Sequence, residues 1–196
     1  MRYFKRILDI IFGSVFLILF SPIILLICIT NFLFLGRPLF FLQERIGYAE
    51  KPFFIIKFRS MRIPESSNSD AQRLSSYGKF IRKHSLDEIV TIINVIKGDM
   101  SLVGPRPLLP EYLPLYTKRQ KIRHSVKPGL TGMTQVMGRN SLKWTRKFAY
   151  DVWYTHNASF LLDMYIIAKT VSVVVLASGT SHKGHATMPK FGEKNS

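Results

Sequence analysis

The hydrophobic pattern is densest near the start of the chain, where nearly every residue from 7 to 35 is apolar. A helix needs about 20 apolar residues to cross the hydrocarbon core of a bilayer, so this run is long enough to enter one. Ser21-Pro22 lies near its middle. Proline removes a backbone donor and clashes with the carbonyl of the residue four positions earlier. The sequence therefore predicts a membrane helix that is kinked or broken at Ser21-Pro22.

Basic residues flank this apolar run on both sides: Arg2, Lys5, Arg6, Arg37, Arg45 and Lys51. Because Lys and Arg favour the cytoplasmic side of a membrane, both ends of the run are expected on that face. A helix broken at Pro22 meets this demand by dipping into one leaflet and returning. This re-entrant interpretation is favoured, and a straight span is the alternative, because prolines also occur in spanning helices. A cleavable signal peptide is not favoured, because the run is too long and no small-x-small cleavage site follows it.

Beyond the anchor, residues 39–42 and 53–58 predict two strands joined by a turn over residues 47–52, which together form a β-hairpin. Period-2 alternation places Lys57 and Arg59 on the same face of the second strand. Two basic side chains that project together indicate either a phosphate-binding pair or a solvated strand face.

Periodic apolar positions predict helices over residues 74–83, 86–97, 144–154 and 160–177. The last of these carries Asp163 and Lys169, so a buried or interfacial helix is favoured over a second crossing. Residues 108–116 contain two prolines and two tyrosines and predict a broken amphipathic helix in the membrane interface. Residues 64–70 are expected to form a loop.

These elements together predict a mainly helical α+β fold for a monotopic membrane protein. Residues 1–36 form the re-entrant helix hairpin, residues 37–180 a small globular catalytic domain with a β-hairpin and interfacial amphipathic helices, and residues 181–196 a polar tail expected to be mobile. A chain of 196 residues is sufficient for one modest domain and an anchor.

Charge narrows the choice of partners. The chain has 28 Lys and Arg against 12 Asp and Glu, a formal net charge of +16. Such an excess indicates nucleic acid, an acidic membrane face or phosphorylated substrates, and the high hydrophobicity favours the membrane. Cys28 is the single cysteine, which excludes an intramolecular disulfide and a cysteine-based metal site. The histidines lack metal-ligand spacing and are expected to be structural: His84, His124 and His156.

The segment Ser85-Leu86-Asp87-Glu88 has two interpretations. As structure it fits a capping box, in which Ser85 caps the first turn of a helix and Glu88 reaches back. As chemistry it places two carboxylates at a helix N-terminus, where positive partial charge favours an ionised Asp87 and attracts phosphate. Two carboxylates beside a diphosphate need cations, and Mg²⁺ held by Asp87, Glu88 and phosphate oxygens would supply one.

Pro105-Arg106-Pro107 presents an arginine on a rigid backbone, because both prolines fix φ and the second favours an extended Arg106. Such an arginine is suited to bidentate phosphate recognition, and a surface turn with a solvated arginine is the alternative. The glycines of 129–132 and Gly138 predict a loop that exposes backbone amides and Arg139. A further basic cluster is expected to face solvent or lipid headgroups: Lys118, Arg119, Lys121 and Arg123.

With these residues in place, the chain resembles the bacterial sugar transferase family of monotopic polyprenyl-phosphate phosphoglycosyl transferases, and among them its small PglC-like members. The resemblance covers nearly the whole chain. It rests on Lys5-Arg6-x-x-Asp9, Ser21-Pro22, Gln43-x-Arg45-x-Gly47, Lys57-Phe58-Arg59-Ser60-Met61, Ser85-Leu86-Asp87-Glu88, residues 97–107 and 127–132, and Gly138-Arg139-Asn140.

The resemblance implies transfer of a sugar 1-phosphate from a UDP-sugar to undecaprenyl phosphate, with release of UMP, at the cytoplasmic face of the bacterial inner membrane. Asp87 would be the nucleophile that forms an acyl-phosphate intermediate, and Glu88 would assist in magnesium binding and in handling the acceptor's proton. Five basic residues would neutralise the diphosphate, the last of them at the nucleotide: Lys57, Arg59, Arg82, Arg106 and Arg139. Downstream glycosyltransferases would be possible partners.

The small size and the PglC-like tail favour an N-acetylated amino sugar such as N,N'-diacetylbacillosamine, used in protein glycosylation. The alternative within the same reaction class is a hexose-1-phosphate transferase that initiates capsule, O-antigen or exopolysaccharide synthesis. An alternative of another class is a membrane-tethered basic protein that binds nucleic acid or acidic lipid without chemistry. The scattered basic residues and the carboxylate pair argue against that alternative, so no nucleic-acid partner is expected.

Overall fold

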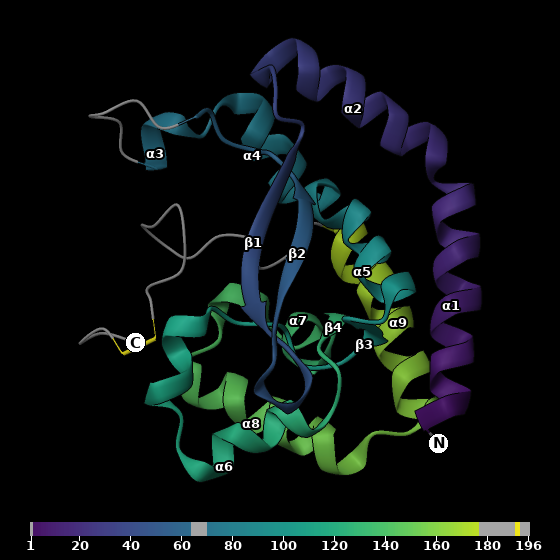
Figure 1. The fold of residues 1–196 in the computed structure, drawn as a ribbon, viewed down its shortest axis with the longest axis vertical. Helices are drawn as coiled ribbons and strands as arrows, with labels where there is room; N and C mark the ends of the chain where they lie inside the picture. Colours follow the sequence, from purple (N-terminus) through teal and green to yellow (C-terminus); the bar gives the residue numbers. More distant parts are fainter. Residues whose placement is uncertain (1, 64–69, 177–190, 193–196) are drawn as a thin grey trace.

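The computed structural model describes residues 2–63, 70–176 and 191–192 (Figure 1). Its α-helices are α1 (Arg2–Leu19), α2 (Ser21–Leu35), α3 (Asp70–Arg73), α4 (Ser76–Lys83), α5 (Ile92–Lys97), α6 (Lys118–Lys121), α7 (Met133–Val136), α8 (Trp144–Asn157) and α9 (Phe160–Val175). Short 3-10 helices are η1 (Tyr48–Glu50), η2 (Leu86–Thr91), η3 (Pro110–Leu115), η4 (Ile122–Ser125) and η5 (Arg139–Ser141). Two small sheets pair β1 (Phe40–Ile46) with β2 (Pro52–Phe58) and β3 (Ser101–Val103) with β4 (Gly129–Thr131). The predicted mainly helical α+β class is confirmed.

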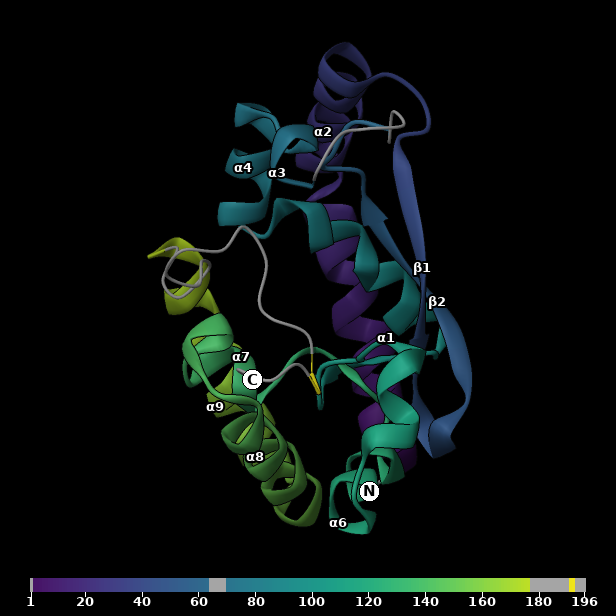
Figure 2. The ribbon, with the colours of Figure 1, turned by 90° about the vertical axis from the view of Figure 1, so that its left-hand side faces the viewer.

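The apolar N-terminal run forms two helices, α1 and α2, bent by 60° relative to each other. The break lies at the predicted place: Ser21 donates its hydroxyl to the Ile18 carbonyl at 2.7 Å, and Pro22 lies in the first turn of α2. Within the described ranges, no single helix has the length and hydropathy to cross a bilayer, whereas this bent pair does when taken together. Figure 1 shows α1 along one side of the molecule, and Figures 1 and 2 both show α2 at the end where α3 and α4 lie.

The helix pair is attached to the rest of the chain at both ends. Near the start of α1, Lys5 forms an ion pair with Asp163 of α9, and Arg6 donates to the carbonyls of Val95 and Ile96 at 2.5 and 2.6 Å. At the end of α2, buried Asn31 donates to the Leu39 carbonyl at 3.1 Å. The outer surface of the pair is apolar and exposed, most of all at Tyr3, Ile18, Leu19 and Leu33.

The predicted β-hairpin is present, with both strands longer than expected. β1 and β2 pair antiparallel from Phe40 opposite Phe58 to Ile46 opposite Pro52. The edge of β2 that faces away from β1 is paired by a side chain: buried Asn94 accepts from the Ile56 amide at 3.0 Å and donates to the Phe54 carbonyl at 2.7 Å. An amide side chain thus supplies the donor and acceptor of a neighbouring strand and joins α5 to the hairpin.

The predicted helix over residues 86–97 is divided in two. Residues 86–91 form η2, and α5 begins at Ile92. The capping box is not formed, because Ser85 has φ of 55°, in the left-handed region, and its side chain makes no capping hydrogen bond. The expected core-facing residues Ile89 and Val90 are buried.

The glycine-rich segment at residues 129–132 corrects another expectation. β3 and β4 pair in parallel, and a Cβ on Gly129 would lie 2.1 Å from the Gly104 amide nitrogen. The Gly129 amide donates to the Pro105 carbonyl and the Gly104 amide to the Thr131 carbonyl. These amides therefore hold two chain segments together and are not exposed for a ligand.

Residues 108–116 also differ from the expectation of an interfacial amphipathic helix. η3 covers residues 110–115, and Tyr112 and Tyr116 are 6% and 7% exposed. Their rings pack against Trp144 and Phe148 of α8, so the tyrosines belong to a core cluster and not to a lipid interface.

The remaining predicted helices are present as α4, α8 and α9. In α9, Ile166 and Asp163 are buried while Leu161 is 78% exposed, in agreement with a buried or interfacial helix. The predicted loop at 64–70, except residue 70 at the start of α3, lies outside the described residues, as does most of the predicted tail. Phe191 of that tail is described, and it packs on Tyr112 and Phe148.

Candidate active site

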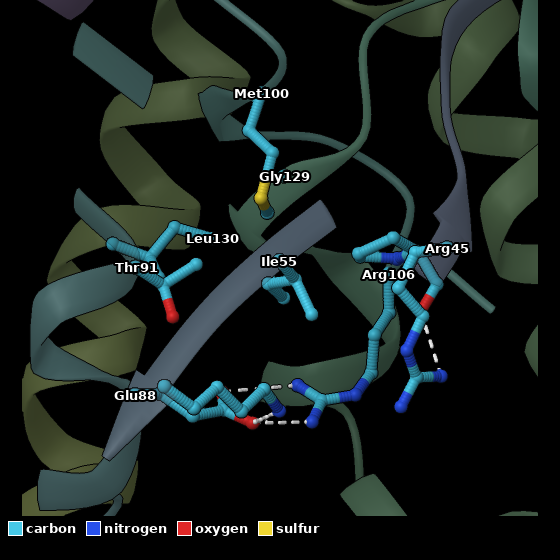
Figure 3. A pocket seen from close by; sticks show the side chains of 10 residues that line it. Arg45, Ile55, Glu88, Thr91, Met100, Arg106, Gly129 and Leu130 are labelled. Carbon is cyan, nitrogen blue, oxygen red and sulfur yellow. Dashed lines mark hydrogen bonds and ion pairs between the residues drawn. The ribbon is translucent and has the colours of Figure 1, made fainter. Parts of the chain in front are cut away.

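The carboxylate of Glu88 lies between two basic side chains. Its Oε1 accepts from Lys57 Nζ at 2.6 Å and from Arg106 Nη2 at 2.5 Å, and its Oε2 accepts from Arg106 Nη1 at 3.2 Å. Figure 3 shows Arg106 aligned with Glu88 in this two-point contact. η2, β2 and the loop after β3 each supply one of the three residues. A bidentate guanidinium–carboxylate contact is among the strongest ion pairs in proteins, so the group is well fixed.

The backbone of Arg106 is held by a second, buried ion pair. Arg123 donates to the Arg106 carbonyl and also to Asp151 of α8, with Nε and Nη2 at 3.0 and 2.8 Å from Asp151 Oδ2. Arg123 and Asp151 are each 3% exposed. The expectation that Arg123 faces solvent or lipid is therefore wrong. Because Pro105 and Pro107 are buried as well, the surface-turn alternative for this loop is also excluded.

The two neighbouring carboxyls have different electrostatic environments. Burial, and secondarily the charge of Glu88, raise the pKa of Asp87 to about 6, although Lys57, Arg82 and Arg106 oppose the shift. Burial would also raise the pKa of Glu88, but Arg106 and Lys57 hold it well below its usual range. Glu88 is thus a fixed anion, whereas Asp87 is a carboxylate of raised basicity without the same direct ion pairs.

Two other predicted arginines, Arg82 and Arg139, are held by hydrogen bonds to serine hydroxyls near Asp87 and Glu88. Arg82 donates its Nε to Ser60 Oγ at 2.7 Å, and its charge acts on Asp87. Arg139 donates to Ser85 Oγ at 3.5 Å, and the charges of Glu88 and Arg106 act on it. Both arginines therefore border the carboxylate pair, and their roles at the diphosphate and the nucleotide stay predictions.

Arg59 does not join Lys57. β2 ends at Phe58, and the buried guanidinium of Arg59 donates to the carbonyls of Leu35 and Gly36 at the end of α2. The expectation that Lys57 and Arg59 project together is wrong, because the alternation stops where the strand stops.

A narrow cavity adjoins the Glu88 ion pairs (Figure 3). Its lining includes Arg45, Ile55, Lys57, Glu88, Thr91 and Arg106. Arg45 was not among the predicted site residues. Extending β1 to residue 46 would have found it, because residues that pair across the hairpin share a face. Arg45 pairs with Phe53 and Gln43 with Ile55, which lie four and two residues before Lys57.

The metal prediction has limited support from the geometry. No group of three or more His, Cys, Asp or Glu able to hold a metal ion occurs in the part of the chain that the structure describes. Both oxygens of Glu88 are engaged by basic side chains. The donor set therefore fits a metal ion at Asp87 alone, with further oxygens from a bound phosphate, and does not fit one held by both carboxylates.

Residues 1–177 match the family model described as Bacterial sugar transferase. The chain belongs to the bacterial sugar transferase family. This sugar transferase is 45% identical over 192 residues to an uncharacterised sugar transferase, EpsL, of Bacillus subtilis, with 95% of each chain covered. It is 34% identical over 197 residues to the exopolysaccharide production protein ExoY of Rhizobium meliloti, with 90% and 87% covered.

Longer relatives carry names that state a reaction. The UDP-glucose:undecaprenyl-phosphate glucose-1-phosphate transferase of Klebsiella pneumoniae is 39% identical over 182 residues, which cover 86% of this sugar transferase and 39% of that relative. The undecaprenyl-phosphate galactose phosphotransferase of Salmonella typhimurium is 33% identical, with 91% and 42% covered. The predicted enzyme class, phosphoglycosyl transferase, is confirmed. The names refer to glucose and galactose, and so favour the hexose alternative over diacetylbacillosamine.

Proposed function

We propose that this enzyme transfers a hexose 1-phosphate from a UDP-hexose to undecaprenyl phosphate and so begins the assembly of an exopolysaccharide or capsule. In the first step an Asp87 oxygen attacks the sugar-bearing phosphorus. The bond between the two phosphates breaks, and UMP leaves with the electron pair. In the second step an oxygen of undecaprenyl phosphate attacks the same phosphorus and releases the Asp87 carboxylate. Glycosyltransferases that extend a lipid-linked sugar would consume the product.

The observation that carries this proposal is the asymmetry of the carboxylate pair. Glu88 is neutralised by Lys57 and Arg106, whereas Asp87 has a pKa of about 6 and is mostly ionised at neutral pH. A nucleophile needs a reactive oxygen, and its raised pKa makes that oxygen more basic than an ordinary carboxylate. The surrounding cations Lys57, Arg82 and Arg106 would offset the charge of the approaching diphosphate.

The proposal includes Mg²⁺, with Asp87 and not Glu88 as its carboxylate ligand. Asp87 would supply one carboxylate ligand and the diphosphate oxygens others, because this ion commonly rests on one or two carboxylates and on substrate phosphates. The ion would add positive charge where charge develops on the leaving UMP. Glu88 is excluded as a ligand as long as Lys57 and Arg106 occupy its oxygens.

We further propose that α1 and α2 lie in the cytoplasmic leaflet of the bacterial inner membrane as a re-entrant hairpin. Both ends of the pair bind the same body: Lys5 and Arg6 at the start, Asn31 and Arg59 at the end. A straight span would place those ends on opposite sides of the bilayer. The exposed apolar surface between them suits lipid, and the acceptor's polyprenyl chain would come from the same leaflet.

Covalent labelling tests the nucleophile. Purified enzyme in nanodiscs is mixed with Mg²⁺ and UDP-glucose or UDP-galactose labelled in the sugar, without acceptor, and is then denatured. We expect labelled wild type and Glu44→Gln, in which an exposed carboxylate of β1 is removed, and unlabelled Asp87→Asn. Equal labelling of Asp87→Asn would refute the assigned nucleophile.

A donor panel tests the sugar and the reaction class together. UMP release is measured with undecaprenyl phosphate and each of UDP-glucose, UDP-galactose, UDP-N-acetylglucosamine and UDP-diacetylbacillosamine. We expect a hexose to be the best donor. Preference for an acetylated sugar would overturn the hexose assignment, and silence with every donor would favour the anion-binding alternative.

Accessibility of engineered cysteines tests the topology. With Cys28 replaced by serine, single cysteines are placed at exposed Tyr3 and exposed Arg37, on either side of the helix pair. A membrane-impermeant thiol reagent should label both positions only when the cytoplasmic face is open to it. Labelling of the two positions from opposite faces would show a straight span.

A further inference from the structure

Arg45 is a partly buried cation that no direct carboxylate contact neutralises within the described residues. Its Nη2 donates to the neutral amide oxygen of Gln43 at 2.5 Å, and its Nη1 lies 3.4 Å from the Pro107 carbonyl. Its Nε is buried and makes no hydrogen bond. The side chain lines the cavity beside Arg106, as Figure 3 shows.

This placement is unfavourable for the free protein. Burial, and secondarily the like charge of Arg106, lower the pKa of Arg45 to about 10, against smaller opposing effects of Glu88, Tyr112 and Glu111. Lys57 and Arg106 already share the one charge of Glu88. The cavity therefore carries more positive than negative charge, which favours the binding of an anion.

We propose that Arg45 is a phosphate-monoester-binding residue of the transfer site, at the end of the cavity next to Arg106. The proposal rests on the proposed function, because the leaving group UMP and the acceptor undecaprenyl phosphate of that reaction each present a phosphate monoester. A guanidinium whose Nε has no partner, and whose Nη1 contact is long, gains from a small shift that brings one of these donors to a phosphate oxygen. Gln43, on the same strand face, orients that guanidinium.

A purely structural role is the competing explanation. Arg45 would then tie β1 to the Pro107 carbonyl and so support the Arg106 loop. That contact is long, at 3.4 Å, and the loop is already held by Arg123 through the Arg106 carbonyl. Loss of a structural tie would lower stability and weaken the binding of all substrates together. Loss of a phosphate contact would weaken the binding only of ligands that carry the monoester.

The test uses full-length enzyme in nanodiscs with Arg45→Gln and Arg45→Lys, and Arg119→Gln as an exposed arginine control on α6. Three quantities are measured: the Kd of UMP by calorimetry, the KM of undecaprenyl phosphate, and the thermal midpoint. We expect Arg45→Gln to raise the Kd of UMP, the KM of undecaprenyl phosphate, or both, by about tenfold or more, with a thermal midpoint near that of wild type. Arg45→Lys should recover part of the loss, and Arg119→Gln should match wild type.

The two arms identify the source of the phosphate. Weaker UMP binding with an unchanged acceptor KM assigns Arg45 to the leaving group, the reverse result assigns it to the acceptor, and loss of both assigns one shared pocket. Unchanged values for both monoesters in Arg45→Gln would overturn the proposal. So would equal losses in both Arg45 variants with a lowered thermal midpoint. Calorimetry with UMP needs no turnover, so this outcome is distinct from a failure of wild-type labelling.

Discussion

Replacement of Glu88 by glutamine should lower the pKa of Asp87 in the enzyme without bound Mg²⁺ or substrate. The attacking oxygen belongs to Asp87, and only its ionised form is a nucleophile. The negative charge of Glu88 is one of the two causes that raise the pKa of Asp87, after burial. Without that charge, Lys57 and Arg106 also lose their carboxylate partner and act more strongly on Asp87. All of these effects lower the pKa of Asp87.

The expected magnitude follows from the pKa of Asp87. A carboxyl with a pKa of about 6 is about 90% ionised at pH 7 and about 10% at pH 5, so the ionised fraction of Asp87 in the metal-free wild type should fall about ninefold between them. A charge on a neighbouring side chain commonly shifts a carboxyl pKa by about 1–3 units, and the charge of Glu88 shifts the pKa of Asp87 upward. Because burial persists in Glu88→Gln, we expect its Asp87 to have a pKa of about 5 or below. The ionised fraction of Asp87 should then fall about twofold or less between pH 7 and pH 5.

The assay is carbon-13 NMR of labelled aspartate carboxyls without Mg²⁺ or substrates, with the Asp87 signal assigned by comparison with Asp87→Asn. Undecaprenyl phosphate is omitted, because a phosphate monoester itself titrates near pH 6 and would mask Asp87. Glu44→Gln serves as the matched carboxylate control and should keep the wild-type profile. A midpoint that stays at about 6, or rises, would refute the electrostatic account.

Three further substitutions probe the support of the site. Asp151→Asn leaves Arg123 buried without its partner and should lower the free energy of unfolding by about 3–5 kcal/mol, measured by urea denaturation; a loss below about 1 kcal/mol would contradict the buried pair. Asn94→Leu removes both side-chain bonds to the free edge of β2 and should cost about 2–5 kcal/mol in the same measurement, with exposed Asn157→Leu as control. Gly129→Ala places a methyl group 2.1 Å from the Gly104 nitrogen and should abolish labelling through displacement of the Arg106 loop; a fully active variant would show that the two segments can separate freely.

Local signals predicted much of the fold. The helix break follows from proline chemistry at Ser21-Pro22, and the hairpin follows from alternation. The proximity of Lys57, Glu88 and Arg106 was expected through the family resemblance and not through spacing, because three separate elements bring them together. Sequence periodicity describes one element at a time, and this ion-pair cluster is a property of three.

The errors have one physical cause in common, a distant partner that the local pattern does not contain. Arg123 looks like a member of a surface cluster until Asp151, 28 residues later, neutralises it in the interior. Tyr112 and Tyr116 look interfacial until Trp144 and Phe148 cover them. Arg59 continues the alternation of β2 in sequence, but the carbonyls of Leu35 and Gly36 at the end of α2 bind its guanidinium. Burial of a polar or amphipathic side chain depends on such partners.

The backbone conformation of Ser85 determines which partners the carboxylate of Glu88 can reach. A capping box would have directed Glu88 back toward the helix start, where it would satisfy a backbone amide. The left-handed conformation of Ser85 prevents that arrangement and begins a 3-10 turn instead. Glu88 is then free to meet Lys57 and Arg106, while Asp87, one residue earlier, remains outside those ion pairs. Two adjacent carboxyls thereby acquire opposite pKa shifts, which is the condition for one to stabilise charge while the other attacks phosphorus.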